Sequence, residues 1–138
     1  MISAIKDAIR DALVEDTAYL ELLGEPVDEY KKTYYAVPPE SPQLPIVVLT
    51  MNFGVPEPID RMIIAATGLL TVTIWAKTNA YEQIAERIIY LYHQKAGLST
   101  TYAIRLVLTR EPEEMFDPQL DAYGKVLEFT MFTRRAII

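Results

Sequence analysis

The stretch Gly68-Leu69-Leu70-Thr71-Val72-Thr73-Ile74-Trp75-Ala76-Lys77 decides the fold, because two different sets of side chains alternate along it. A period of two places successive side chains on opposite faces of a β-strand. One face is purely apolar and is predicted to pack on a core; it consists of Leu70, Val72, Ile74 and Ala76. The other face mixes threonines with Leu69, Trp75 and Lys77. Large apolar groups on both sides predict that both faces of this strand are covered.

Further strands are expected on the N-terminal side of this stretch. Residues 46–53 form a nearly continuous apolar run, and Pro45 can only open that strand because proline supplies no backbone donor. Residues 32–37 favour a short strand ahead of a proline-broken loop over residues 38–44. The segment 55–61 also contains prolines and is expected to be the tip between two long strands.

Two more strands are predicted on the C-terminal side, over residues 102–109 and 125–133. Residues 111–118 lie between them and read Glu-Pro-Glu-Glu-Met-Phe-Asp-Pro. Because this segment is acidic and broken by two prolines, it is expected to be an irregular connection.

Helical spacing of apolar residues marks the remaining segments. The first helix carries a stripe of Ile2, Ile5, Ile9 and Leu13. Asp16 then fits the N-cap of a second helix, in which Tyr19, Leu20 and Leu23 point inward and Gly24 is the stop. Asn79 and Glu82 make a capping-box-like start for a helix over residues 80–95, with Gly97 as its stop. Its buried stripe consists of Tyr81, Ile84, Ala85, Ile88 and Tyr92.

This order of elements predicts an α+β fold, a mixed, mostly antiparallel sheet of about five strands with two main helices packed on one face. The 138 residues match one ordinary domain, so residues 1–138 are expected to form a single unit. We expect the two helices to dock through Ile5, Ile9, Ile84 and Ile88 on the strand residues Leu70, Val72 and Ile74.

Composition excludes several classes of protein. A chain that is 51% hydrophobic and 23% charged is globular rather than disordered. No apolar run approaches the ~20 residues needed to cross a bilayer, and no secretory signal opens the chain, so a soluble, non-exported domain is expected. The net charge of −6 has the wrong sign for binding nucleic acid or anionic membranes. Cysteine is absent, which excludes disulfides, thiolate nucleophiles and cysteine-type metal sites.

Motifs for catalysis are missing from the sequence. The single histidine, His93, has no second histidine or cysteine with which to share a metal, and it is expected to be a solvent-exposed helix-end residue. No serine lies in a nucleophile elbow, and no two glycines are close enough for a phosphate loop. We therefore expect no enzyme activity and no cofactor. One alternative stays open, a small enzyme or ligand-binding module with a pocket between helices and sheet. It would need convergent polar groups within the apolar stripes, and the sequence offers few, namely Thr50, Asn52, Glu128 and Thr130.

Self-association is indicated by apolar groups that lie off the main stripes. Since the helices would cover only one face, the other apolar face is a candidate for subunit association, and the open alternative is that loops cover it. The aromatic candidates are Tyr34, Tyr35, Trp75 and Phe132; the two tyrosines are adjacent, so only one can enter the core. Basic candidates that could pair with a neighbouring subunit are Lys31, Lys32, Arg134 and Arg135.

Four features follow one another along nearly the whole chain. They are the helix stop Leu22-Leu23-Gly24, the proline-rich approach over residues 42–49, the strand end Val72-Thr73-Ile74-Trp75-Ala76, and the helix over residues 80–95. Their order resembles that of the tail terminator, or minor tail completion, proteins of long-tailed bacteriophages. The resemblance implies an α+β subunit that assembles as a ring, commonly a hexamer. Such rings cap the tail tube, stop its polymerisation and join the head connector.

The resemblance also implies partners and a location. The partners would be further copies of the chain, the tail tube protein, and a head connector or head completion protein. The protein would be assembled in the host cytoplasm and reside in the tail or neck of the virion, without a membrane. DNA would pass through the ring without specific binding.

Acidic residues are expected at the channel or its rim. A six-fold ring would carry a formal charge of 6 × (−6) = −36, and like charge lowers the affinity for phosphate. The candidates are Glu57, Asp60, Glu111, Glu113, Glu114, Asp117 and Asp121. Two other uses of these acids stay open, pairing with basic residues of the next subunit and simple solvation.

Overall fold

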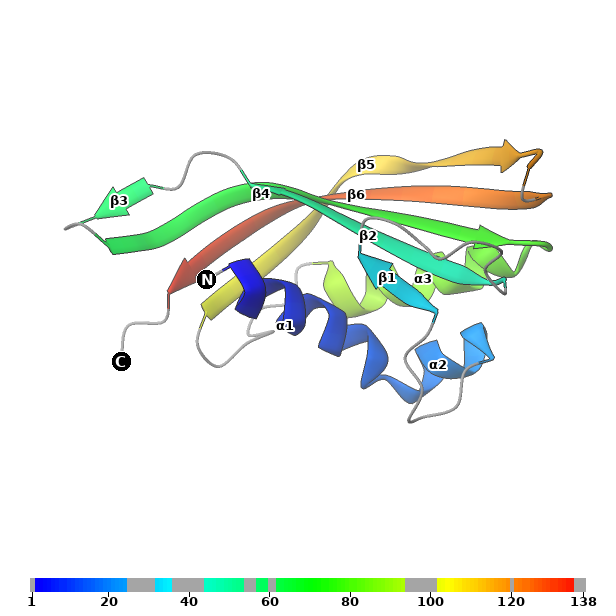
Figure 1. Cartoon of the computed structure of the whole chain (residues 1–138), viewed down its shortest axis with the longest axis horizontal. Coiled ribbons are helices and arrows are strands. Elements are labelled where there is room, and N and C mark those ends of the chain that lie inside the picture. The colour runs from blue at the N-terminus through cyan, green and yellow to red at the C-terminus, as the bar shows by residue number, and fades with distance from the viewer. Residues whose placement is uncertain are drawn as a thin grey trace.

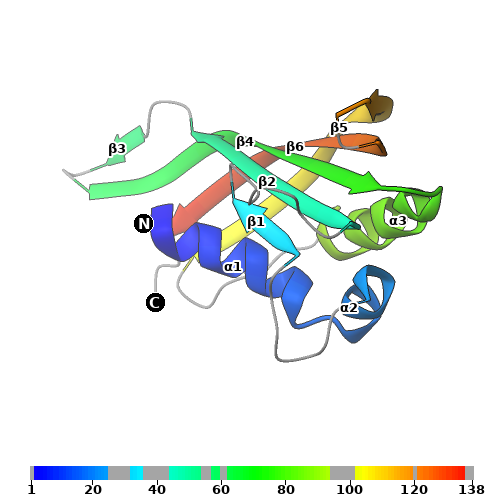
Figure 2. The same ribbon diagram turned by 45° about the vertical axis from the view of Figure 1, so that its right-hand side comes forward.

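The computed structural model describes residues 2–24, 32–35, 44–53, 57–59, 62–93, 102–119 and 121–135. Within these ranges three helices lie on the same side of a six-stranded sheet (Figures 1 and 2). The helices are α1 (Ile2–Val14), α2 (Thr17–Leu23) and α3 (Ala80–Tyr92). The strands are β1 (Thr33–Tyr35), β2 (Ile46–Phe53), β3 (Glu57–Ile59), β4 (Met62–Ala76), β5 (Tyr102–Asp117) and β6 (Ala122–Arg135).

The sheet is mixed and mostly antiparallel, which confirms the predicted α+β class. Its strands follow the order β1-β2-β4-β6-β5, and β3 pairs separately with β4. Among the described strand pairs, β1 and β2 alone run parallel, and the others are antiparallel. Among the described strands, β5 is therefore an edge strand of the sheet. The β5–β6 turn and the C-terminal end of β6 lie at opposite ends of the molecule (Figure 1).

The core fills the layer between the helices and the sheet. Ile5 and Ile9 of α1, Ile84 and Ile88 of α3, and Leu70, Val72 and Ile74 of β4 are fully buried in one cluster. This arrangement confirms the predicted docking of the helices. Tyr92 of α3 adds an edge-to-face contact with Phe129, at 5.6 Å between ring centroids, and its hydroxyl donates a hydrogen bond to the carbonyl of Ile9.

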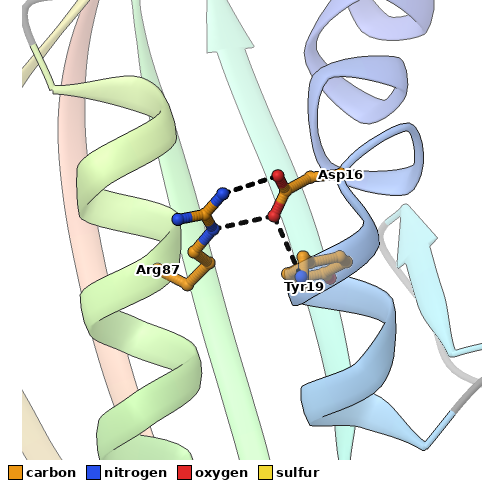
Figure 3. Close-up of polar contacts among 3 residues, drawn as sticks. All are labelled: Asp16, Tyr19 and Arg87. Carbon is orange, nitrogen blue, oxygen red and sulfur yellow. Dashed lines mark hydrogen bonds and ion pairs between the residues drawn. The ribbon is translucent and has the colours of Figure 1, made fainter.

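Asp16 joins two of the helices (Figure 3). Its Oδ2 accepts a hydrogen bond from the Tyr19 backbone N–H at 2.9 Å, so it is the N-cap of α2, as predicted. The Arg87 guanidinium of α3 donates to both Asp16 oxygens, at 2.7 and 2.8 Å. The hydrogen bonds from Arg87 hold the pKa of Asp16 below its ordinary value, with burial opposing them. At the other end of α2, Gly24 adopts a left-handed conformation, with φ at 67°, and ends the helix as predicted.

The acidic segment over residues 111–118 is a correction to the predicted loop. Strand β5 continues to Asp117 and pairs with β6 up to the turn. The pairing register shifts twice, after Leu108 and after Arg110, and Pro112 falls inside the second irregularity. A bulge on an edge strand leaves residues without ladder partners, so a proline is tolerated there.

Other predicted boundaries also change. Strand β3 occupies part of the predicted 55–61 loop. Strand β4, with which β3 pairs, begins at Met62, earlier than the predicted start at Gly68. Asn79 precedes α3 as predicted, but its side chain makes no capping hydrogen bond. Helix α3 ends at Tyr92 rather than near residue 95, and the predicted stop at Gly97 falls outside the described residues.

His93 is the residue at which α3 ends, and it is not the purely solvent-exposed side chain that was predicted. It is half-buried, forms a parallel bridge with Leu106 on the outer edge of β5, and accepts a hydrogen bond at Nδ1 from the Leu108 N–H at 3.0 Å. The extended backbone that this bridge requires explains why the helix stops here. None of the helices in the described ranges has the length and apolarity that crossing a membrane would require.

Candidate assembly surface

The sheet has an outer face, defined here as the side opposite the helices. In the paired register, Leu69, Thr71, Thr73 and Trp75 of β4 lie opposite Thr130, Glu128, Val126 and Gly124 of β6. These residues alternate with the buried core residues, so they share the outer face. All three helices lie on the other side (Figure 2). This arrangement agrees with the prediction that the helices cover only one of two apolar faces.

The adjacent tyrosines divide between the two faces. Tyr35 pairs in register with Leu49, packs against the core cluster, and donates a hydrogen bond from its hydroxyl to the Lys6 carbonyl at 2.5 Å. Lys6 Nζ lies 5.5 Å from the centroid of the same ring. Tyr34 pairs with Val48, which places it on the outer face, half-buried. Of the two predicted interface tyrosines, Tyr34 is therefore the one that shares a face with Trp75 and Phe132.

An apolar patch with a positive charge lies at one end of the outer face. Phe132 is 46% exposed and Leu69, its diagonal neighbour across β4 and β6, is 40% exposed. The exposed Arg105 of β5 lies directly opposite Phe132 in the register. We call Leu69, Arg105 and Phe132 the Phe132 patch. The sequence pattern indicates Phe132 but not its neighbours Arg105 and Leu69, because these come from other strands and no single segment encodes the pairing register.

A second exposed aromatic group lies at the opposite end of the sheet, on the side of the helices. Phe116 and Tyr123 are 49% and 50% exposed, and their ring centroids are 5.1 Å apart across the β5–β6 hairpin. Glu114 is exposed on the same face of β5. Burial and then the Glu114 carboxylate raise the pKa of the neighbouring Tyr81 hydroxyl. We call Glu114, Phe116 and Tyr123 the hairpin-tip patch. The sequence pattern did not indicate this patch, because residues 111–118 were predicted to be an irregular loop.

The predicted channel acids occupy several different settings. Glu113 and Glu114 are exposed neighbours on β5 and point to opposite faces of the sheet. Asp117 accepts a hydrogen bond from the Gln119 N–H at 2.9 Å, and Asp121 has a positive φ of 49°, so both help to form the hairpin turn. The backbones of Glu57 and Glu111 lie in β3 and β5, and Asp60 lies outside the described residues.

The predicted basic residues are also distributed unevenly. Lys32 donates a hydrogen bond from Nζ to the Leu23 carbonyl at 2.8 Å, which satisfies the C-terminal end of α2 within the subunit. Arg134 and Arg135 occupy the last two positions of β6, beyond Phe132. Lys31 lies outside the described residues.

The polar residues of the predicted pocket are not between the helices and the sheet. Thr50, Asn52, Glu128 and Thr130 all lie on the outer face, as their pairing with outer-face positions of β4 shows. Among the described residues, the buried polar or charged ones are Thr33 and Thr133. No group of three or more acidic or histidine side chains in the described ranges is arranged to hold a metal ion. These four residues therefore cannot line a pocket between the helices and the sheet, as the ligand-binding alternative would need.

Comparisons with solved structures show that the fold of this chain occurs in other proteins. The chain is similar to a chain of a solved structure described as "Virion of native gene transfer agent (GTA) particle", with a TM-score of 0.66 and 16% sequence identity. The match covers 96% of this chain and 96% of that chain. No protein-family model and no curated protein sequence matches the chain. The two chains therefore share a fold along essentially their whole lengths.

Proposed function

We propose that this protein is a non-enzymatic structural component of a virion. The observation that carries the proposal is the likeness of fold to a chain of a gene transfer agent virion, over 96% of both chains. Two features of the molecule support it. Exposed aromatic side chains lie at both ends of the sheet, and none of the described helices covers its outer face.

Within the virion, we propose the more specific role of a tail terminator. The protein would form a ring, commonly of six copies, that caps the tail tube, ends its polymerisation and joins it to the head connector. The resemblance of the sequence to tail terminator proteins motivates this role. The negative formal charge suits a channel through which DNA passes without adhering.

Electron microscopy of negatively stained protein tests the proposal. The purified chain would be imaged alone and after mixing with tubes assembled from the tail tube protein of the same virion. We expect rings in the first sample and a ring at one end of each tube in the second, with tubes that no longer lengthen when tube protein is added. A chain that stays monomeric in both samples would contradict the ring. Rings that never bind tubes would contradict the terminator role and leave a ring-forming protein.

A further inference from the structure

We infer that copies of this chain associate head-to-tail, with the hairpin-tip patch of one copy covering the Phe132 patch of the next. The inference rests on the proposed function, because it specifies which surfaces build the ring. We infer a second copy of the chain as the partner of each patch, because the two patches carry charged side chains of opposite sign beside their apolar groups.

The two patches are complementary in chemistry. Each combines exposed apolar side chains with a charged one, and these two charges are opposite: Glu114 at the hairpin tip and Arg105 beside Phe132. Lys125 lies opposite Glu114 in the strand register, and no ion pair joins the two among the described contacts. Large apolar groups that a monomer leaves exposed mark association sites, and aromatic residues contribute most to binding at such sites. Opposite charges next to the aromatic contacts would select the register in which the patches meet.

The positions of the patches determine the kind of assembly. Residues 123 and 132 of β6 are about 30 Å apart at the usual rise of a strand, so the patches lie at opposite ends of the sheet. Tyr123 pairs with Ala76 and shares the helix side, whereas Phe132 pairs with Thr67 on the outer face. Suppose that two copies made both contacts with each other. The helix side of each copy would then have to face the outer side of the other, at both ends at once, which two such sheets cannot do. The contact is therefore heterologous, and repeating it gives a closed ring or an open filament.

Direct strand pairing along the β5 edge is the competing way to associate. His93 already forms a bridge with Leu106 on this edge, and its imidazole accepts a hydrogen bond from the Leu108 N–H. Between Leu108 and Glu113 the pairing register shifts twice, and Pro112 falls within the second shift. Bulges, prolines and charges are the means by which natural edge strands avoid pairing. Contact through side-chain patches is therefore favoured over extension of the sheet.

Two serine variants test the inference. Phe116→Ser disables the hairpin tip and Phe132→Ser disables the Phe132 patch, and both side chains are exposed, so circular dichroism should show an unchanged fold. Each variant alone should associate about tenfold more weakly or worse than the wild type in light scattering. Mixed in equal amounts, they retain one intact contact and should form a dimer of one copy of each, and nothing larger.

Charge exchange provides an independent test with a matched control. Arg105→Glu or Glu114→Arg alone should weaken association, and the double variant should recover it in part. Glu86→Arg, an exposed position on α3 outside both patches, should leave association unchanged. If the wild type assembles and the patch variants assemble equally well, the head-to-tail contact is wrong and the ring remains. If the mixed serine variants fail to pair, the contact is not heterologous. A wild type that stays monomeric alone and with tail tubes overturns the inference together with the proposed ring.

Discussion

Trp75 on β4 covers Gly124 on β6, so closely that a Cβ atom on Gly124 would lie 2.6 Å from Cζ3 of the indole. The two residues are direct partners in the antiparallel register, on the outer face. An aromatic side chain laid over a glycine of the neighbouring strand fills the space that the missing side chain leaves. Trp75, predicted from the sequence as an interface residue, therefore first serves the sheet of its own subunit and is half-buried there. Its role in assembly stays a prediction.

Gly124→Val should displace the indole. A side chain at this position cannot coexist with the ring where it lies, and overpacking commonly lowers the free energy of unfolding by about 1–3 kcal/mol. Because Trp75 is the single tryptophan, the displacement should appear as a red shift of the fluorescence emission. Thr71→Val, on the same face but away from the indole, is the control and should leave the emission unchanged. An unshifted spectrum for the Gly124 variant would show that the ring does not lie over this glycine.

Ile88→Ala should be strongly destabilising. The side chain is fully buried in the cluster that joins α3 to the sheet, so truncation leaves a cavity and lowers the free energy of unfolding by on the order of 2–5 kcal/mol. Urea denaturation followed by circular dichroism measures the change. Glu86→Ala, two residues earlier and exposed, is the matched control, for which we expect almost no change. A loss below about half a kcal/mol for Ile88 would place it outside the core, given the magnitudes usual for cavities.

Substitutions of Asp16 should separate its two roles. Asp16→Asn keeps an oxygen that can cap α2 but loses the charge that pairs with Arg87. Asp16→Ala loses both, and removal of the cap alone lowers the free energy of unfolding by about 0.5–2 kcal/mol. We therefore expect Asp16→Ala to be less stable than Asp16→Asn at neutral pH, as measured by urea denaturation. Equal stability of the two variants would show that the cap contributes nothing.

Asp16 also predicts a dependence of stability on pH. Its pKa is lowered from 3.8 in the folded state, so near and below this pH the unfolded chain binds more protons than the folded one. The contribution of Asp16 is present above pH 3.8 and is lost as the pH falls through the lower, folded-state pKa. In Asp16→Asn this part of the acid dependence should disappear, so the difference in stability from the wild type should narrow as the pH falls. A difference that stays constant down to pH 2 would contradict a lowered pKa.

The sequence was sufficient for the elements whose pattern is local. Alternation along residues 68–77 places Leu70 in the core and Trp75 on the other face, and the Asp16 and Gly24 boundaries of α2 follow from cap chemistry. The long β5 strand could not be predicted in this way, because acids and prolines favour a loop. Pairing with β6 overrides that preference, and the bulges absorb Pro112.

The candidate site depended on register, which no single segment encodes. Phe132 could be identified as lying off the core stripe, but its neighbours Arg105 and Leu69 come from other strands. The prediction that His93 is solvent-exposed was wrong for the same reason, because the N–H that donates a hydrogen bond to its imidazole belongs to Leu108 of β5. The close approach of Trp75 to Gly124 likewise follows from the pairing of two strands and has no signal in either segment alone.

Glu113 and Glu114 provide the last prediction, because their opposite orientations separate the two uses of the acidic segment. Glu114 lies in the hairpin-tip patch, so Glu114→Lys should weaken self-association in light scattering. Glu113 pairs with Val126 on the outer face, away from that patch. If Glu113 borders the channel, Glu113→Lys should leave rings intact and make them retain DNA at low salt, since each added lysine neutralises phosphate and releases counterions. Retention should vanish as the salt concentration rises. If Glu113→Lys abolishes the rings, Glu113 belongs to the contact between subunits, and if it changes neither property, it is a solvated side chain on an exposed strand.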